Sequence, residues 1–381
     1  MAQIKPQFET FARIKVVGIG GGGSNALQRM IQARIKGVEF IAINTDAQDL
    51  HKSDAPTKIH IGKNLSRGLG AGMNPEVGRQ AAIASKEEIQ DALKGADMVF
   101  ITAGLGGGTG SYGSSIVAEI ARDVGSLAVG VVTRPFSFEG RQRNQIAESA
   151  WNRLRDNVDA LITIPNDRLL SVIDRKTPIM EAFSIVDDVL RQGVQGISDL
   201  ITIPGIINVD FADVKAVMAN SGSALMGIGR ATGEDRAVEA AKQAINSPLL
   251  DVSIEGAQGV LFNVSGGNDI AMAEINEAAK IITENIDPEA KVIFGAVESE
   301  SLKKGEIQIT VVATGFETSV SPRQSTVAGV FDAPQQQHST STVSKFMEED
   351  QSQTDKNLEV IDDEESDQLD IPAFIRRKMK N

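Results

Sequence analysis

The sequence has 381 residues, of which 36 are Gly and none is Cys, and its formal net charge is −13. The lack of Cys excludes a disulfide framework and a thiolate zinc site, and it favours a reducing compartment. The negative charge argues against a general nucleic-acid binder, because phosphate neutralisation requires clustered Lys and Arg. No apolar run approaches the roughly 18 residues of a membrane-spanning helix, and no secretory signal is apparent, so we expect a cytoplasmic protein.

The first part of the chain alternates short apolar runs with amphipathic stretches. We predict buried strands at residues 13–18, 38–44, 97–103, 126–133 and 159–165. Helices are predicted between them, at residues 24–33, 75–94, 114–123 and 141–157. Such alternation indicates a parallel sheet covered by helices on both faces. We therefore predict an α/β domain over residues 1–177.

The rest of the chain divides into four predicted parts. A long amphipathic pattern at 178–202 predicts one connecting helix. A smaller α+β domain is predicted at 203–317, with strands at 223–229, 259–265, 292–297 and 307–313 and helices at 213–220, 236–246 and 271–285. Few apolar residues follow, so we predict a disordered acidic linker at 318–366, and then a partner-binding peptide at 367–381. Much of the negative charge lies there, because residues 345–370 include eleven acidic and only two basic residues.

Fourteen of the Gly residues fall in three short segments, at 18–23, 68–72 and 104–113. Gly lets the backbone approach a phosphate closely, and a helix N-terminus offers free N–H groups and a positive dipole end. Ligands of open α/β sheets bind at the carboxyl ends of the strands, so three such loops predict one phosphate-binding site. The sequence has no G-x-x-x-x-G-K-[ST] motif, which excludes a P-loop NTPase.

The first Gly segment also satisfies the G-x-G-x-x-G fingerprint of dinucleotide-binding proteins. Asp46, at the end of the second predicted strand, lies where a ribose-binding carboxylate would be expected in an NAD enzyme. A Rossmann-type oxidoreductase is therefore an alternative. This alternative lacks an evident hydride-transfer site. None of the three His residues lies in a Gly loop or beside Asp210 and Asp213, the acidic pair described below.

The run ITAGLGGGTGS at 101–111 resembles the signature loop of the tubulin/FtsZ family. The similarity is nearly continuous over residues 13–316, through GIGGGGSNA, NTDAQ, RGLGAGMNPEVG, VVTRPFSFEGRQR, TIPNDRLL and NVDFADV, and it resumes in LDIPAFIRRK at 369–378. The resemblance implies a Rossmann-like GTPase domain, a long central helix and a smaller α+β C-terminal domain. It also implies a GTPase of bacterial cell division whose filaments form the division ring at midcell, on the inner face of the membrane.

The same resemblance implies which residues bind GTP or GDP. They are Gly21, Gly22, Gly23, Ser24, Asn25, Gly72, Gly106, Gly107, Gly108, Thr109, Gly110, Glu139, Arg143, Asn166, Phe183 and Asp187. A carboxylate at Asp187 can accept hydrogen bonds from both N1–H and the 2-amino group of guanine, and adenine offers no equivalent pair of donors. Phe183 lies four residues earlier on the same helix face, so it can pack on the base. Mg²⁺ is expected to bind mainly through phosphates and water, and no protein ligand is assigned.

Asp210 and Asp213 are three residues apart at a predicted helix start, just after Asn208. This spacing places both carboxylates on one face near the helix N-terminus, where a helix cap is the structural alternative. The resemblance implies that this segment docks onto the nucleotide of the neighbouring subunit and orients the attacking water. A monomer would then bind GTP but hydrolyse it poorly. Head-to-tail contacts that do not close generate filaments.

Tyr112 departs from the family pattern, which ordinarily has a Gly at this place and a Pro where Ser115 stands. A Tyr cannot copy the positive φ of Gly. Either its ring points away and the loop keeps its shape, which we favour, or the ring crowds the phosphates. The second case predicts a GTP-binding filament protein with slowed or absent hydrolysis.

The C-terminal segment carries apolar anchors at Ile371, Phe374, Ile375 and Met379, with basic residues between them. Such a segment can fold on binding and lay an amphipathic helix in a groove. The resemblance implies that residues 370–378 bind membrane tethers such as FtsA, ZipA or SepF, alongside other division proteins. One short apolar face and four basic residues are too little for stable insertion into a membrane.

Overall fold

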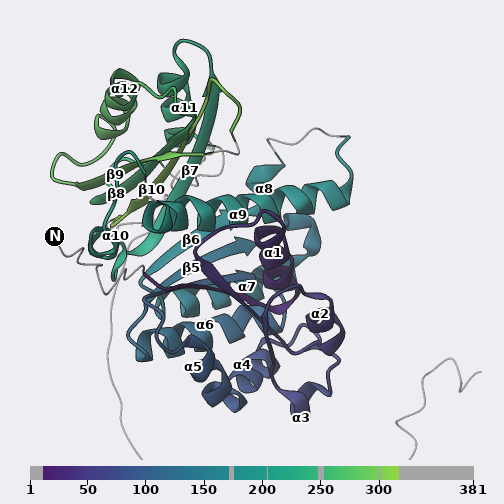
Figure 1. The fold of residues 1–381 in the computed structure, drawn as a ribbon. Helices are drawn as coiled ribbons and strands as arrows, with labels where there is room; N and C mark the ends of the chain where they lie inside the picture. The colour runs from purple at the N-terminus through teal and green to yellow at the C-terminus, as the bar shows by residue number, and fades with distance from the viewer. Residues whose placement is uncertain (1–11, 171–175, 204, 248–252, 300–301, 317–381) are drawn as a thin grey trace, which may run out of the picture. The chain divides into compact units, whose positions relative to one another are not determined.

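The computed structural model describes residues 12–170, 176–203, 205–247, 253–299 and 302–316 (Figure 1). All of these residues belong to one compact unit of the chain. The linker predicted at 318–366 and the peptide predicted at 367–381 lie outside the described residues. No helix within the described ranges combines the length and the apolar character needed to cross a bilayer.

A parallel sheet forms the first part of the molecule, as predicted. Its strands, in spatial order, are β3 (Thr57–His60), β2 (Val38–Asn44), β1 (Ile14–Ile19), β4 (Met98–Gly104), β5 (Leu127–Arg134) and β6 (Ala160–Pro165). All except β3 begin and end within one residue of a predicted strand. Strand β3 was not predicted, because an edge strand of only four residues shows no clear period. Since the strands are parallel, their carboxyl ends meet at one edge of the sheet.

Side chains of the central strand alternate between two hydrophobic cores. Ile14 and Val16 of β1 lie in the core shared with α1 (Gly20–Gln32) and α9 (Ile179–Thr202). Val17 and Ile19 lie in the core on the opposite face. The helices of that second core are α4 (Pro75–Ala84), α5 (Lys86–Leu93), α6 (Thr109–Asp123) and α7 (Arg141–Arg155). The sheet is therefore covered on both faces, as Figure 1 also shows.

Three of the predicted helices differ from the structure by more than two residues or in number. The helix predicted at 75–94 is two helices, α4 and α5, which meet at Ser85. The helices predicted to begin at residues 24 and 114 begin at Gly20 and Thr109, inside the Gly segments. Gly is a poor helix former, so sequence patterns place a helix start after a Gly run even where the backbone has already turned helical. The short helices are α2 (Ala47–Lys52), α3 (Lys63–Ser66), η1 (Ser137–Glu139) and α8 (Asn166–Leu169).

The second part of the chain extends the same sheet. Its elements are α10 (Phe211–Met218), β7 (Gly222–Thr232), α11 (Arg236–Ile245), β8 (Gly259–Gly266), α12 (Met272–Thr283), β9 (Lys291–Glu298) and β10 (Glu306–Thr314). Strand β7 pairs parallel to β6 at one end and antiparallel to β10 along its length. The order β7-β10-β8-β9 therefore continues the first sheet, while α11 and α12 bury a third core against it.

Helix α9 connects the two parts, as the sequence predicts. It packs against α1 and β5 of the first part and against β8 and β9 of the second (Figure 1).

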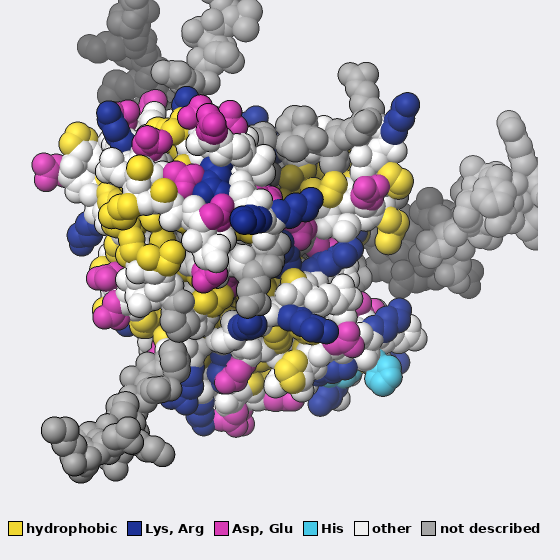
Figure 2. Space-filling model, turned by 45° about the horizontal axis from the view of Figure 1, so that its top comes forward, with side chains coloured by type: hydrophobic (Ala, Val, Ile, Leu, Met, Phe, Trp, Pro, Cys, Tyr) yellow, Lys and Arg dark blue, Asp and Glu magenta, His cyan; other side chains and the backbone are white. Residues whose placement is uncertain are grey.

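On the face of the molecule seen in Figure 2, Lys and Arg side chains are interspersed with Asp and Glu side chains.

Candidate functional site

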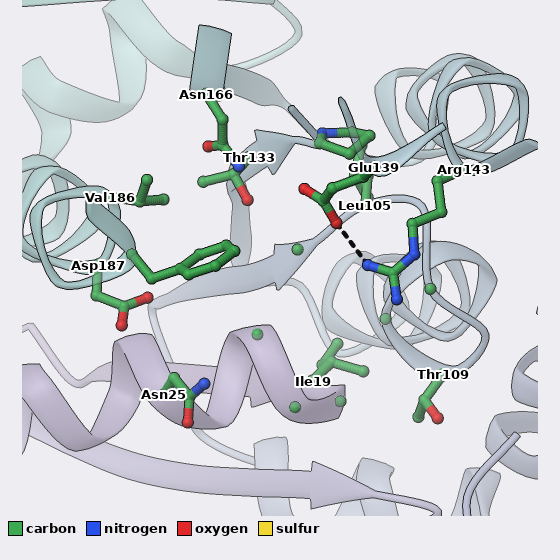
Figure 3. Close-up of a pocket in the computed structure, with 18 of the residues that line it drawn as sticks. Ile19, Asn25, Leu105, Thr109, Thr133, Glu139, Arg143, Asn166, Val186 and Asp187 are labelled. Carbon is green, nitrogen blue, oxygen red and sulfur yellow. Dashed lines mark hydrogen bonds and ion pairs between the residues drawn. The ribbon is translucent and has the colours of Figure 1, made fainter. Parts of the chain in front are cut away.

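A pocket of about 340 Å³ lies at the carboxyl ends of the central parallel strands (Figure 3). Ile19 ends β1, Gly104 ends β4 and Thr133 lies near the end of β5, and all three line the pocket. Such a volume falls within the usual range of small-molecule sites, about 300–1,000 Å³. The pocket therefore occupies the position at which open α/β sheets bind ligands.

One wall of the pocket is the N-terminus of α1. Gly20, Gly21 and Gly22 line the pocket, and Gly20 adopts a φ of +69° that allows the helix to begin directly after β1. A Cβ atom on Gly22 would lie 3.1 Å from the backbone N of Gly104, so Gly lets the two loops approach closely. The first turn carries no acidic residue. Its free N–H groups can therefore bind an anion.

The N-terminus of α6 forms a second wall with the same properties. Gly107, Gly108, Thr109 and Gly110 line the pocket, and no side chain caps the helix. Its first turn also lacks an acidic residue. Two helix N-termini thus face one cavity, which is suited to a ligand with more than one phosphate group.

Glu139 and Arg143 place opposite charges in the lining of the pocket. Glu139 lies in η1 and Arg143 lies in the first turn of α7. One carboxylate oxygen of Glu139 accepts a hydrogen bond from the N–H of Phe136 at 2.9 Å, and the other accepts one from Nη1 of Arg143 at 2.6 Å (Figure 3). Arg143 is the only cationic side chain among the described residues that line the pocket. It can therefore meet anionic charge that the backbone amides leave unbalanced.

Helix α9 supplies the opposite side of the pocket. Phe183, Val186, Asp187 and Leu190 lie on one face of the helix and all line the cavity. The ring of Phe183 packs edge-on against Phe136, with 5.6 Å between ring centroids. Burial raises the pKa of Asp187 to about 6, and the positive charge of Arg29 offsets part of this effect. This side therefore combines an aromatic surface with a partly desolvated carboxylate, as recognition of a flat polar base requires.

Two amide side chains complete the lining, Asn25 from α1 and Asn166 from α8. Asn166 is buried, and its Oδ1 has no hydrogen-bond partner among the described residues. Buried polar atoms in native proteins nearly always have a partner. The oxygen of Asn166 is therefore open to a hydrogen-bond donor from a ligand or from water.

Four of the predicted nucleotide-binding residues do not line this pocket: Gly23, Ser24, Gly72 and Gly106. A Cβ atom on Gly23 would lie 2.4 Å from the carbonyl O of Thr102, so this Gly permits close packing of α1 on β4. Gly106 has a φ of +101° and donates its N–H to Oγ of Ser111 at 2.9 Å, which closes the loop before α6. Ser24 is buried in α1, and Gly72 lines a separate groove.

Asn208, Asp210 and Asp213 are exposed around the start of α10 and do not line the pocket. Asp210 Oδ1 accepts the N–H of Ala212 at 3.2 Å and so caps α10. Asn208 Oδ1 accepts the N–H of Gly205 at 2.7 Å. The pocket of one chain therefore contains none of the three predicted catalytic side chains.

Asp46 does not line the pocket either. Its Oδ1 accepts the N–H groups of Gln48 and Asp49 and caps α2. The ribose contact required by the oxidoreductase alternative therefore has no structural support. No cluster of three or more His, Asp or Glu residues suited to a metal ion occurs in the described part of the chain.

Tyr112 lies in the first turn of α6, and its ring points away from the pocket. Its hydroxyl is hydrogen-bonded to Oγ of Ser149 on α7 at 2.8 Å, and its ring lines the separate groove that also contains Gly72. Its backbone φ is not positive, so this position does not require Gly. Of the two expected arrangements, the structure has the one in which the phosphate loop is not crowded.

Several lining residues were not predicted individually, although Gly20 and Gly104 lie in the predicted Gly segments. They are Ile19, Gly20, Gly104, Leu105, Thr133, Pro135, Val186 and Leu190. Thr133 and Pro135 could have been identified, because Thr133 ends the predicted strand at 126–133 and Pro135 follows it, at the ligand-binding edge of the sheet. Val186 and Leu190 lie three and seven residues after Phe183, a spacing that also places them on its helix face.

Comparisons with known proteins find similar domains and similar solved structures. The model of the Tubulin/FtsZ family GTPase domain matches residues 13–174, and the model of the FtsZ family C-terminal domain matches residues 222–317. The chain is similar to an empty FtsZ dimer from M. jannaschii, with 47% identity and a TM-score of 0.78 over 81% of this chain and 89% of that chain. A mutant of the same protein gives the same identity and TM-score and is covered over 92% of its length. CetZ2 from Haloferax volcanii, solved as a GTPγS-bound protofilament, shares the fold at 21% identity, with a TM-score of 0.68 over 81% of this chain and 94% of that chain.

Proposed function

Since the chain belongs to the FtsZ family and is a GTPase, we propose that it assembles head to tail into filaments that form the bacterial division ring and hydrolyses GTP where subunits meet. The main support is the arrangement of one pocket. Two uncapped helix N-termini and Arg143 lie at its phosphate end, and Phe183 and Asp187 lie on α9. This arrangement fits a nucleoside phosphate with a base that offers two adjacent donors.

In the proposed complex, the phosphates bind to the backbone amides at the starts of α1 and α6 and to Arg143. Mg²⁺ contacts the phosphates and water, because the described residues form no cluster of carboxylates at the pocket. Guanine packs on Phe183 and donates to Asp187. Asn166 contributes its unsatisfied oxygen. Glu139 holds Arg143 in place and accepts a hydrogen bond from the ribose.

Hydrolysis requires a second subunit in this proposal. Asp210 and Asp213 are exposed on α10 and absent from the pocket of their own chain, so they are available to the nucleotide of a neighbour. There they would orient the attacking water, with Asn208 beside them. The CetZ2 protofilament supports this assembly at the level of the fold. The outward position of Tyr112 favours hydrolysis over the alternative of a filament with a blocked phosphate loop.

The test compares GTP with GDP in light scattering and measures phosphate release in the same samples. The wild-type chain should scatter with GTP and release phosphate. Asp213→Ala should bind GDP normally, because the Asp213 side chain does not line the pocket of its own chain. It should release little phosphate, because the proposed water-orienting carboxylate is lost. Glu277→Ala removes a similarly exposed carboxylate from α12 and serves as the control. Normal phosphate release by Asp213→Ala would contradict the assignment, and no GTP-dependent scattering by the wild type would contradict assembly.

The proposed location is the cytoplasm at midcell, where residues 370–378 bind a membrane tether such as FtsA, ZipA or SepF. The support is the amphipathic sequence of this segment, which lies outside the described residues. Deletion of residues 369–381 should leave GTP turnover intact and abolish recruitment to the membrane in cells. Recruitment that survives the deletion would contradict this role.

A further inference from the structure

Tyr112 lies in α6 directly after the turn that lines the nucleotide pocket. It is the fourth residue of the helix, which begins at Thr109. Helical side chains lean towards the N-terminus, so a residue covers the turn that precedes it. Gly108 and Thr109 line the nucleotide pocket and lie four and three residues before Tyr112. The ring therefore covers the outer side of the turn whose inner side faces the phosphates.

The same ring is held by two residues of α7. Its hydroxyl is hydrogen-bonded to Oγ of Ser149 at 2.8 Å, and the guanidinium of Arg153 lies 4.5 Å from the ring centroid. Ser149 and Arg153 are four residues apart and therefore lie on one face of α7. The ring also packs against the buried core that α6 and α7 share. Tyr112 is thus held through its edge, its face and its hydroxyl.

This contact links two helices that each bring a phosphate contact to the pocket. Helix α7 carries Arg143 in its first turn, six residues before Ser149, which is about 9 Å along the helix axis. No other hydrogen bond or ion pair joins α6 to α7 in the part of the chain that the structure describes. A Gly at position 112 would leave the two helices joined by apolar contacts alone, which resist sliding less than a directional bond.

We infer that Tyr112 is a positioning residue for nucleotide binding, because it fixes the N-terminal turn of α6 relative to Arg143 on α7. The inference rests on the proposed function, in which those two elements bind the phosphates. Ser149 is the partner through which Tyr112 acts. The free pocket then already holds its amides and its cation at the spacing that the phosphates require, so less ordering is needed on binding.

The test measures the dissociation constant of a fluorescent GDP analogue with the full chain at concentrations below assembly. Tyr112→Phe keeps the ring and its cation–π contact and removes only the hydroxyl, while Ser149→Ala removes the partner. The control is Ser126→Ala, which removes a buried hydrogen bond to the carbonyl of Ala96 at the amino end of β5, far from the pocket. Thermal unfolding is recorded for every variant.

Each single variant should weaken GDP binding by about 2- to 10-fold, the range that one neutral hydrogen bond supports. The double variant should bind GDP no more weakly than the single variant with the lower affinity, because both changes remove the same hydrogen bond. In GTP hydrolysis above the assembly threshold, KM should rise while kcat changes little. Ser126→Ala should lower Tm and leave GDP affinity unchanged.

Unchanged GDP affinity in Tyr112→Phe and Ser149→Ala, with a lowered Tm, would show a purely structural role and overturn the inference. Additive losses in the double variant would also overturn it, because the two residues would then act independently. A wild-type chain that fails to bind GDP would overturn the proposed function together with this inference. The wild-type measurement therefore separates the two kinds of failure.

Discussion

Gly78 of α4 contacts the backbone of Gly108 in the phosphate loop so closely that a Cβ atom on Gly78 would lie 2.3 Å from the carbonyl O of Gly108. Gly78 lies in the first turn of α4, whose N-terminus is capped by Asn74. Helix α4 therefore supports the loop from the side opposite the pocket. The absence of a side chain at residue 78 therefore allows this close approach of α4 to the loop that lines the pocket.

Gly78→Ala should destabilise the protein and weaken GDP binding. Inside a helix, Ala is ordinarily more favourable than Gly by about 1 kcal/mol. Here the added methyl group meets a backbone oxygen, and α4 or the loop must move. Thermal unfolding with and without GDP measures both effects. Gln80→Ala, on the exposed face of the same helix, is the control, and a Gly78→Ala protein with raised Tm and unchanged affinity would refute the contact.

Glu139→Ala should weaken GDP binding by about tenfold. The change leaves the N–H of Phe136 without its acceptor and frees Arg143 from a 2.6 Å ion pair. A charged hydrogen bond is worth about 1.5–3 kcal/mol, although part of this loss falls on the fold rather than on binding. Calorimetric titration with GDP gives the affinity. As the control, Asp156→Ala removes an exposed ion pair with Arg155 at the other end of α7 and should leave the GDP affinity unchanged. Equal losses of GDP affinity in both variants would rule out a local role for Glu139.

Guanine nucleotide affinity should fall as the pH is lowered through about 6. Burial raises the pKa of Asp187 to about 6, and only the ionised carboxylate accepts two hydrogen bonds from guanine. Asp187→Asn should bind GDP about 100-fold more weakly at pH 7.5, since two charge-assisted bonds are lost. It should also lack this step in the pH profile while keeping the titration of the nucleotide itself. Wild-type and variant profiles of the same shape would show that Asp187 does not contact the base.

The same raised pKa should affect the stability of the ligand-free protein in the opposite direction. The folded state takes up a proton at Asp187 near pH 6, whereas the unfolded chain does so near the ordinary value of 3.8. The folded state therefore binds more protons between these values, and this residue makes the fold less stable as the pH rises through that interval. Asp187→Asn should consequently raise the Tm of the ligand-free protein at pH 7.5. A lowered Tm would contradict the burial of a charged carboxylate.

Two substitutions at Asp210 should separate its observed helix cap from its proposed catalytic role. Asp210→Asn retains an oxygen that can accept the N–H of Ala212, so Tm should change little while phosphate release falls. Asp210→Ala should lose phosphate release and also about 1 kcal/mol of stability. GDP affinity of the monomer should be unchanged in both, because Asp210 does not line the pocket. Wild-type turnover in Asp210→Asn would mean that the residue serves only as a cap.

Much of the first part of the fold could be predicted because its strands are continuous apolar runs bounded by polar or Gly residues. Strand β2 matches its predicted ends, and β1 and β4 are shifted by one residue. The break at Ser85 could not be predicted in the same way, because the residues on both sides keep a helical pattern. There the packing of α4 and α5 against α6 decides where the chain turns.

The local sequence by itself determined the parallel strands, the Gly segments at their ends and the acidic pair at the start of α10. The spacing of apolar residues and the presence of Gly influence the backbone within a few residues, so these features can be predicted without tertiary contacts. Only the tertiary structure decided which Gly lines the pocket: Gly22 does, whereas Gly23 packs on β4 and Gly72 lies in another groove. It also decided the direction of Tyr112. That ring turns towards Ser149, 37 residues further along the chain, because the packing of α6 on α7 brings a hydrogen-bond partner to its hydroxyl.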